Sequence, residues 1–181
     1  MEMKMLKKLN DFALTPLSWW LLAASALGLE LIALYFQYGM GLEPCIMCIY
    51  QRVAILGLLI AGVVGAIGNK YMPVRLVAFA IWAISAIWGL QLALEHVEIQ
   101  ANAGSLFYSC DIFPNFPSWM PIHEWFPAVF EATGDCGEIN WSFLGYSMPQ
   151  WMVVNYGIYV LLFAIFFIAR IVGIVNNNKS T

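Results

Sequence analysis

Four long apolar runs restrict what this chain can fold into more than any other feature of its sequence. Each is long enough to cross the hydrocarbon of a bilayer as a helix, which takes about 20 residues. Charged residues make up only 10% of the chain, whereas soluble domains have about 25%. The sequence therefore predicts an all-α membrane protein, a four-transmembrane-helix bundle formed by one domain over residues 1–181. The expected spans are about residues 17–36, 49–68, 74–94 and 150–174.

Lysine and arginine positions predict which side of the membrane each connection faces. Residues 95–149 contain neither, and positive residues stay on the cytoplasmic side of short loops. We therefore expect both termini in the cytoplasm and residues 37–48 and 95–149 on the external side, which in bacteria is the oxidising periplasm. The basic residues behind this expectation are Lys4, Lys7, Lys8, Lys70, Arg75, Arg170 and Lys179.

A cleavable signal peptide is the alternative for the first run, because Lys4, Lys7 and Lys8 precede it and small residues occur at positions 23–26. The run continues to Phe36, however, and cleavage would leave an odd number of spans. We expect an uncleaved first span.

A Cys-x-x-Cys motif, Cys45 and Cys48, lies directly before the second run. A helix that begins there directs its positive end at the sulfurs and favours thiolate over thiol. Arg52 follows Cys48 by four residues, on the same helical face. We predict a redox site in which Arg52 lowers the pKa of Cys48 or binds the carbonyl oxygen of an electron acceptor. The alternative is that Arg52 extends to the nearer headgroups.

Glu30 and His96 are two further polar residues in or beside the spans. Glu30 and Arg52 should lie at similar depth on antiparallel helices, so we expect a buried ion pair, direct or through a bound group. The alternative for Glu30 is a protonated or internally bonded packing residue. His96 follows Glu95 at the outer end of the third run and could relay protons or bind a ligand, although it could also be merely solvated.

All four cysteines, Cys45, Cys48, Cys110 and Cys136, fall on the external side. They permit three pairings, of which the natural one joins Cys45 to Cys48 and Cys110 to Cys136. A bridge across Cys-x-x-Cys restrains little chain, so two purely structural disulfides fit poorly. We expect no metal site, because the second pair lacks the ligand spacing of a zinc knuckle and the compartment is oxidising. Exchange between two redox pairs is favoured.

The long external segment contains apolar residues at helical spacing. Pro127 interrupts this pattern, so we expect one or two short helices on the membrane surface. An aromatic loop packed on the helix ends is the alternative. The apolar positions are Ile122, Trp125, Phe126, Val129 and Phe130.

Taken in order, these motifs resemble the bacterial disulfide bond formation protein B family, DsbB, over essentially the whole chain. Each motif is weak alone, but their order and their placement on the bilayer make the resemblance specific. The motifs are Pro44-Cys45-x-x-Cys48-Ile49-Tyr50-x-Arg52, Glu95-His96, Cys110-Asp111, Gly134-Asp135-Cys136 and Met148-Pro149-Gln150-Trp151.

The resemblance implies a protein-disulfide oxidoreductase of the bacterial inner membrane that reduces a quinone, ubiquinone or menaquinone, and whose active site faces the periplasm. Cys110, paired with Cys136, would be attacked by a reduced thioredoxin-fold dithiol oxidase of the DsbA type. Cys45 would then exchange with the loop pair and release Cys48. Cys48 would face the quinone together with Arg52 and His96.

Three other functions compete with this interpretation. A related thiol oxidase with a narrower set of substrates would carry the same catalytic residues. A membrane scaffold with structural disulfides would keep its cysteines oxidised regardless of quinone supply. An electron exporter of the DsbD type fits less well, because such proteins place cysteines inside their spans, whereas every cysteine here is external.

Overall fold

The computed structural model describes residues 2–103, 110 and 114–178, and within them four helices are long and apolar enough to cross a membrane. This confirms the predicted all-α, four-span fold. Each helix contains the run expected from the sequence and extends beyond it. Asp111 and Lys179, named above, lie outside the described residues. The four helices are α2 (Pro16–Leu34), continued by the π-helix η1 (Tyr35–Gly39), α3 (Ile46–Gly68), α4 (Met72–Ala101) and α7 (Met148–Asn178).

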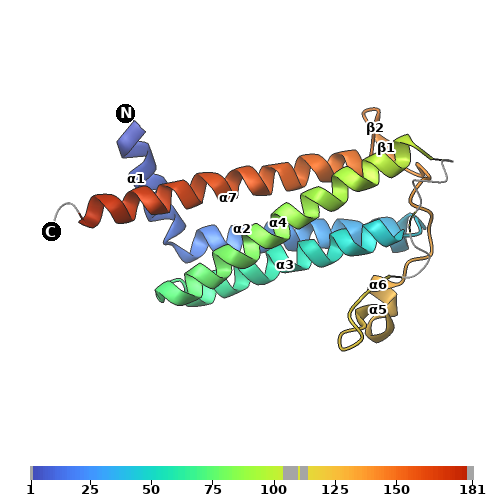
Figure 1. Cartoon of the computed structure of the whole chain (residues 1–181), viewed down its shortest axis with the longest axis horizontal. Coiled ribbons are helices and arrows are strands. Elements are labelled where there is room, and N and C mark those ends of the chain that lie inside the picture. Colours follow the sequence, from blue (N-terminus) through green and yellow to red (C-terminus); the bar gives the residue numbers. More distant parts are fainter. Residues whose placement is uncertain (1, 104–109, 111–113, 179–181) are drawn as a thin grey trace.

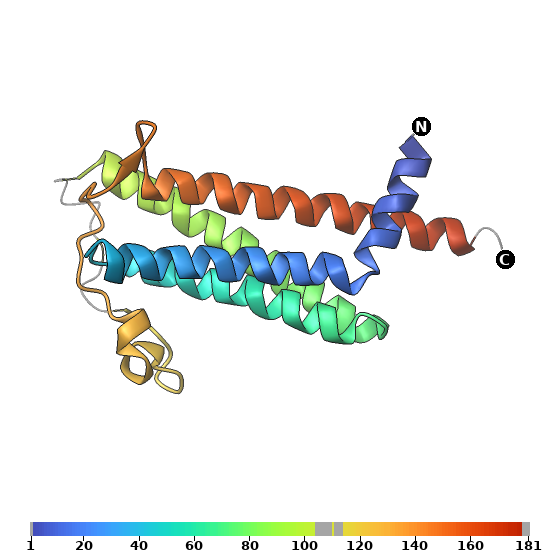
Figure 2. The ribbon, with the colours of Figure 1, turned by 180° about the vertical axis from the view of Figure 1, so that it is seen from behind.

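The four helices run side by side (Figures 1 and 2). α3 packs between α2 and α4, and α4 also packs against α7. α2 and α7 are not among the closely packed pairs. The bundle is therefore least closed where its first and last spans face each other.

Aromatic rings fill the interior at one end of the bundle. We call this the aromatic end and define it by Trp19, Phe79 and Trp82. The ring centroids of Trp19 lie 4.9 Å from Phe79 and 6.0 Å from Trp82. A Cβ atom at Gly65 would collide with the Trp19 ring. Glycine on α3 thus lets α2 approach closely enough to pack.

The opposite end carries Cys45, Cys48 and His96, and we call it the cysteine end. Tyr156 of α7 connects this end to the packed core, because it contacts both α3 and α4. The Tyr156 hydroxyl donates to the carbonyl oxygen of Gln51 at 2.6 Å, and its ring lies so close to Gly89 that no Cβ would fit there. A side chain of α7 therefore holds α3 and α4 in fixed positions just below the cysteines.

A short N-terminal helix, α1 (Glu2–Ala13), lies across α7 (Figure 1). Arg170 of α7 donates a hydrogen bond from Nη1 to Oδ1 of Asn10 at 2.6 Å. α1 was not predicted from the apolar runs, because this helix is too short and too charged to span a bilayer.

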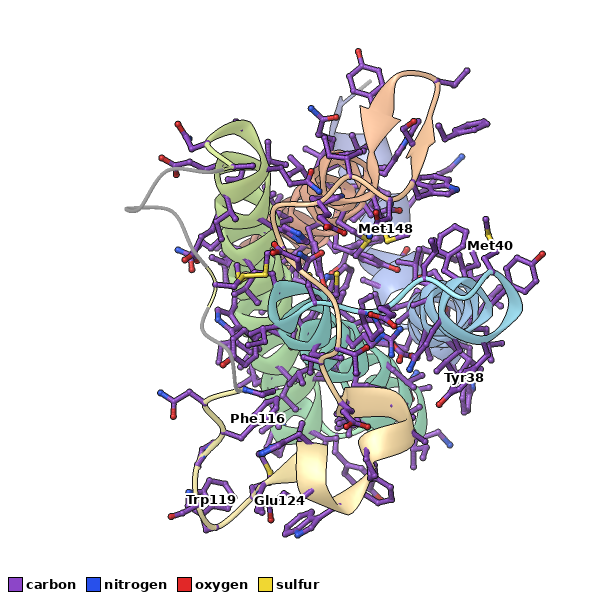
Figure 3. All side chains as sticks on the ribbon, turned by 90° about the vertical axis from the view of Figure 1, so that its right-hand side faces the viewer. Tyr38, Met40, Phe116, Trp119, Glu124 and Met148 are labelled. Atoms are coloured by element: carbon purple, nitrogen blue, oxygen red, sulfur yellow. A yellow bond between two sulfur atoms is a disulfide. The ribbon has the colours of Figure 1, made fainter. Side chains whose placement is uncertain are left out.

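The long connection between α4 and α7 contains two one-turn helices, α5 (Ile122–Trp125) and α6 (Pro127–Phe130). The break between them falls at Phe126, because Pro127 has no N–H with which to continue the helix. Figure 3 looks onto the cysteine end and shows Trp119 at the outer edge of this part of the loop. The expected short helices are present, and their contact with a membrane surface stays a prediction.

A two-stranded hairpin, β1 (Ser142–Phe143) and β2 (Tyr146–Ser147), leads directly into α7. Both turn residues, Leu144 and Gly145, have positive φ, at 52° and 81°. This geometry matches the right-handed twist of a two-residue hairpin turn. The hairpin was not predicted from the sequence.

Candidate active site

Cys45 and Cys48 lie at the N-terminal end of α3. Cys45 precedes the first turn, and its Sγ accepts a hydrogen bond from the backbone N–H of Cys48 at 3.3 Å. The two Sγ atoms are 2.8 Å apart as free thiols, not as the expected disulfide. The hydrogen bond between the two thiol groups, together with burial, raises the pKa of Cys45. Cys45 therefore retains the proton that the two sulfurs share.

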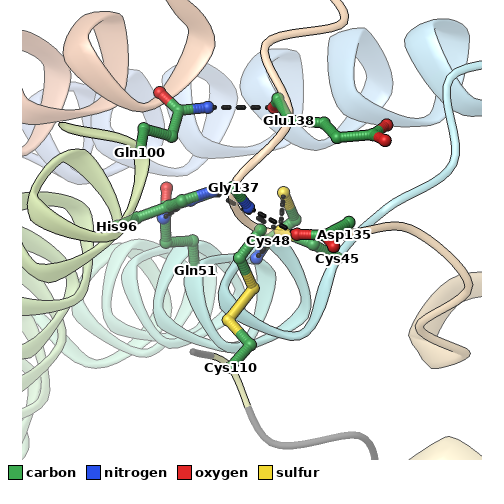
Figure 4. The surroundings of a disulfide bond; sticks show 10 residues. Cys45, Cys48, Gln51, His96, Gln100, Cys110, Asp135, Gly137 and Glu138 are labelled. Atoms are coloured by element: carbon green, nitrogen blue, oxygen red, sulfur yellow. Dashed lines mark hydrogen bonds between the residues drawn. A yellow bond between two sulfur atoms is a disulfide. The ribbon is translucent and has the colours of Figure 1, made fainter. Parts of the chain in front are cut away.

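Cys110 and Cys136 are joined in a disulfide, with their Cα atoms 6.2 Å apart. Cys136 belongs to the same buried apolar cluster as Cys45, and Cys48 and Cys110 pack against that cluster. Figure 4 shows the disulfide beside the two thiols. The fold thus brings together two cysteine pairs that are far apart in the sequence, as thiol–disulfide exchange between them would require.

Two backbone hydrogen bonds hold the loop cysteine against the helix pair. The N–H groups of Thr133 and Gly134 both donate to the carbonyl oxygen of Pro44, at 3.0 and 3.1 Å. Gly134 passes so close to Glu43 that a Cβ would meet its carbonyl oxygen. Pro44 directly precedes Cys45, so the chain leading to Cys136 is fixed to the chain leading into α3.

His96 projects from α4 into this site and is only 3% exposed. Its Nε2 lies 3.6 Å from Sγ of Cys45, and its Nδ1 lies 3.3 Å from Nε2 of Gln51. Gln51 therefore fixes the orientation of the imidazole while the other ring nitrogen faces the thiol. A histidine placed in this way can hold a proton that leaves the cysteine pair.

Arg52 is buried, 5% exposed, and turns inward rather than toward headgroups. Its Nη1 donates to Oε1 of Gln37 at 2.6 Å and to the carbonyl oxygen of Val129 at 2.7 Å. Its Nη2 donates to the carbonyl oxygen of Ala33 at 3.2 Å. One guanidinium therefore links α3, the end of α2 and the loop helix α6.

Glu30 does not form the direct ion pair with Arg52 that the sequence suggested. No Glu30–Arg52 contact within 4.0 Å occurs among the described residues, and neither carboxyl oxygen of Glu30 has a hydrogen-bond partner there. Arg52 instead uses neutral acceptors. Equal depth on two helices fixes height but not the direction in which each side chain points, so a direct contact does not follow from it. An interaction of Glu30 with Arg52 through a bound group stays a prediction.

A cavity of about 280 Å³ adjoins the thiols. Cys48, Arg52 and His96 line it together, and Gln37 and Gln51 add two amides. The rest of the wall comes mainly from α2 and α7, the two spans that are not closely packed together. Met148 at the start of α7 is part of it. Its apolar wall includes Leu29, Ile32, Phe36, Ile55, Trp151 and Met152.

The cavity walls suit a flat apolar ring that carries carbonyl oxygens. Apolar side chains would cover the faces of such a ring, and a few polar groups would orient its oxygens. Arg52 supplies a fixed cation and Cys48 a sulfur in the same wall. The residues present therefore fit a quinone.

Sequence reasoning missed Gln37 and Gln51. Gln51 stands directly before Arg52, and Gln37 lies seven residues after Glu30, about two helical turns along the same face. Amides in an otherwise apolar span were the available signal. The carbonyl contacts of Arg52 with Ala33 and Val129 had no signal in the sequence.

Comparison with known proteins gives one consistent result. A family profile described as disulfide bond formation protein DsbB matches residues 15–166. The disulfide bond formation protein B of Psychromonas ingrahamii is 56% identical over 154 residues, which cover 85% of this chain and 83% of that protein.

Two further relatives carry the same name. The protein from Pseudoalteromonas translucida is 52% identical over 141 residues, covering 78% of this chain and 82% of the relative. The protein from Shewanella loihica is 49% identical over 160 residues, covering 88% and 93%. The residues matched by the family profile, 15–166, extend over the positions of both cysteine pairs and over the first three spans.

Proposed function

The chain belongs to the disulfide bond formation protein B family, DsbB, and from this membership we propose that it oxidises a periplasmic dithiol protein of the DsbA type and passes the electrons to a membrane quinone. It is a multi-pass membrane protein of disulfide bond formation, a disulfide oxidoreductase. The quinone and the partner are the proposed parts. One observation carries them: two cysteine pairs share a buried cluster beside an apolar cavity whose wall includes Cys48.

In the proposed exchange, the reduced partner's thiolate attacks Sγ of Cys110, forms a mixed disulfide and releases Cys136 as a thiolate. Cys136 then attacks Cys45 in the oxidised Cys45–Cys48 pair and releases Cys48. The partner's second thiol resolves the mixed disulfide and frees Cys110. Cys110 finally attacks Cys136, which restores the loop disulfide and leaves Cys45 as a thiol.

The redox states in this structure correspond to the end of that exchange. The loop pair is oxidised, and Cys45 and Cys48 are thiols. A quinone bound in the cavity would then take up the two electrons and two protons that leave the dithiol as its disulfide re-forms. Ubiquinone and menaquinone both present the ring and carbonyl groups for which the cavity is suited.

Arg52 and His96 have separate roles in this proposal. Arg52 holds a positive charge in a water-poor wall, where it stabilises negative charge that develops on Cys48 or on a carbonyl oxygen of the acceptor. The three hydrogen bonds of Arg52 to neutral oxygens keep that charge in place. His96, next to Cys45, holds a proton as the disulfide forms.

We propose that the cysteine end faces the periplasm of a bacterial inner membrane and that both termini are cytoplasmic. Lys70 and Arg75 lie at the turn between α3 and α4, at the end of the bundle opposite Cys45. The positive-inside tendency assigns that turn to the cytoplasm. The thiols then face the compartment in which disulfides persist.

The test is quinone absorbance over time with the full chain in detergent, a short-chain ubiquinone or menaquinone, and a reduced DsbA-type protein. We expect quinone loss matched by partner disulfide formation, its absence in Cys48→Ser, and an unchanged rate in His123→Gln, a substitution in the loop helix α5. No loss with either quinone would refute the proposed acceptor.

A further inference from the structure

We infer that the reduced Cys45–Cys48 pair and His96 form a binding site for a soft divalent metal ion of the zinc and cadmium class. Their three potential ligand atoms lie within 4.8 Å of one another. Sγ of Cys45 and Nε2 of His96 are 3.6 Å apart. That distance matches the about 3.5 Å that separates a sulfur and a nitrogen ligand on a tetrahedral zinc ion with ordinary bond lengths.

A small cavity of about 60 Å³ lies against these ligands and is lined by all three of them. The two sulfurs must move apart from 2.8 Å to the about 3.8 Å of two thiolates on one zinc ion. Cys48 also lines the larger apolar cavity, so its side chain has space on both sides. The space exceeds what one water needs, so a water can complete four-coordination.

The acidic residues that line the small cavity favour a cation, whereas the charge of Arg52, which lines the larger cavity together with Cys48, opposes one. Glu43, Asp135 and Glu138 line the small cavity, and residues 95–149 contain no lysine or arginine. This acidic lining raises the local concentration of divalent ions. Two thiolates neutralise a divalent ion and a neutral imidazole adds no charge, so the complex is neutral. A neutral complex is tolerated where Cys45 and His96 are each only 3% exposed.

Gln51 completes the support of the site. Its amide nitrogen faces Nδ1 of His96 in the structure, and a flip of this amide would turn its oxygen toward Nδ1 to accept an N–H. The lone pair of Nε2 then points toward the sulfurs. Histidine ligands are normally oriented by such a partner on the second ring nitrogen.

The site exists only in the reduced protein. The ion displaces the two thiol protons, and no electrons are transferred. When the pair is oxidised, both sulfurs are bonded to each other and neither is available as a thiolate ligand. A bound ion therefore occupies both sulfurs and stops their exchange with Cys110–Cys136.

The test uses the full chain in detergent, reduced with a phosphine that is then removed, and titrated with Cd²⁺ under nitrogen. To leave a single dithiol, the titration is run on a Cys110→Ser, Cys136→Ser variant, in which Cys45 and Cys48 are the two remaining cysteines. We expect ultraviolet thiolate-to-cadmium absorbance with one ion per reduced chain, and none after the Cys45–Cys48 pair is oxidised. Binding to the oxidised protein, or no such absorbance in the reduced protein, would overturn the inference.

The role of His96 as a ligand is tested by changing it to glutamine and, as a control, making the same change at His123. His96→Gln should weaken Cd²⁺ binding at least tenfold, because a ligand is lost. His123→Gln changes the other histidine, in α5, and should leave the affinity unchanged. Equal affinity in the wild type and His96→Gln would refute the three-ligand site and leave only a simple dithiol. Because binding is read from a spectrum, the result does not depend on the proposed quinone or partner.

Discussion

The aromatic end and the cysteine end of the bundle differ in how their interiors are filled. Between Trp19, Phe79 and Trp82 the cavity is only about 20 Å³. At the cysteine end a cavity of about 280 Å³ lies beside buried Arg52 and His96. Cavities and buried polar groups cost stability, whereas close packing supplies it. The aromatic end therefore stabilises a fold whose other end can carry a cavity and buried polar groups.

Cys110→Ser should have the largest effect, confined to the cysteine end. Without Cys110 the partner has no disulfide to attack, so oxidation of the DsbA-type protein should be abolished. The variant also loses the Cys110–Cys136 disulfide, so its thermal midpoint in detergent should fall. Partner oxidation is followed by alkylation of its free thiols. Oxidation at the wild-type rate would show that the assignment of Cys110 is wrong.

Arg52→Gln should lower turnover by about 10- to 100-fold, since hydrogen bonds to a charged group contribute about 1.5–3 kcal/mol. The loss should appear in quinone reduction with the full chain in detergent. Arg170→Gln is the matched control, because Arg170 contacts Asn10 of α1, far from the thiols. If the two variants lose turnover equally, the site does not depend on the charge at position 52.

Gly65→Ala should affect the aromatic end alone. The new Cβ collides with the ring of Trp19, and overpacking of this kind costs about 1–3 kcal/mol. Gly28→Ala, where nothing lies within 4 Å, should stabilise its helix by about 0.5–1 kcal/mol. Unfolding in mixed detergent would measure both. A turnover loss in folded Gly65→Ala would break the division between the two ends.

Tyr38→Phe should have the smallest effect. The Tyr38 hydroxyl donates to the carbonyl oxygen of Ala128, so its loss should weaken the anchoring of α6 by about 0.5–1.5 kcal/mol. Amide hydrogen exchange in residues 128–131 should become faster. Tyr35→Phe is the control, because the Tyr35 hydroxyl makes no hydrogen bond among the described residues. Equal exchange in both variants would mean that Tyr38 does not hold the loop.

The four spans could be predicted from the sequence because the bilayer imposes a length and an apolar composition on each. Cys48 and Arg52 could be placed on one face because helical spacing is fixed. These inferences concern single helices, whose geometry depends on nearby residues alone. The sequence therefore predicted best what a single element determines.

Contacts between elements were not predictable in the same way. The N–H groups of Thr133 and Gly134 meet Pro44 across a long stretch of chain, and no residue type in either segment encodes that meeting. Arg52 donates hydrogen bonds to the carbonyl oxygen of Val129 and the side-chain amide of Gln37, and it makes no direct contact with Glu30. The rotation of each helix about its own axis determines which side chains of neighbouring helices meet. The sequence pattern of one helix does not fix the rotation of the helices packed against it.

The apolar cavity has a consequence for the order of events during biosynthesis. Its wall combines Leu29 to Arg52, which are made early, with residues of α7 such as Trp151 and Met152, which are made late. Synthesis proceeds from the N-terminus. A growing chain therefore presents Cys45 and Cys48 well before it has a complete cavity beside them. The last helix to be inserted turns a membrane-bound pair of thiols into an enclosed site.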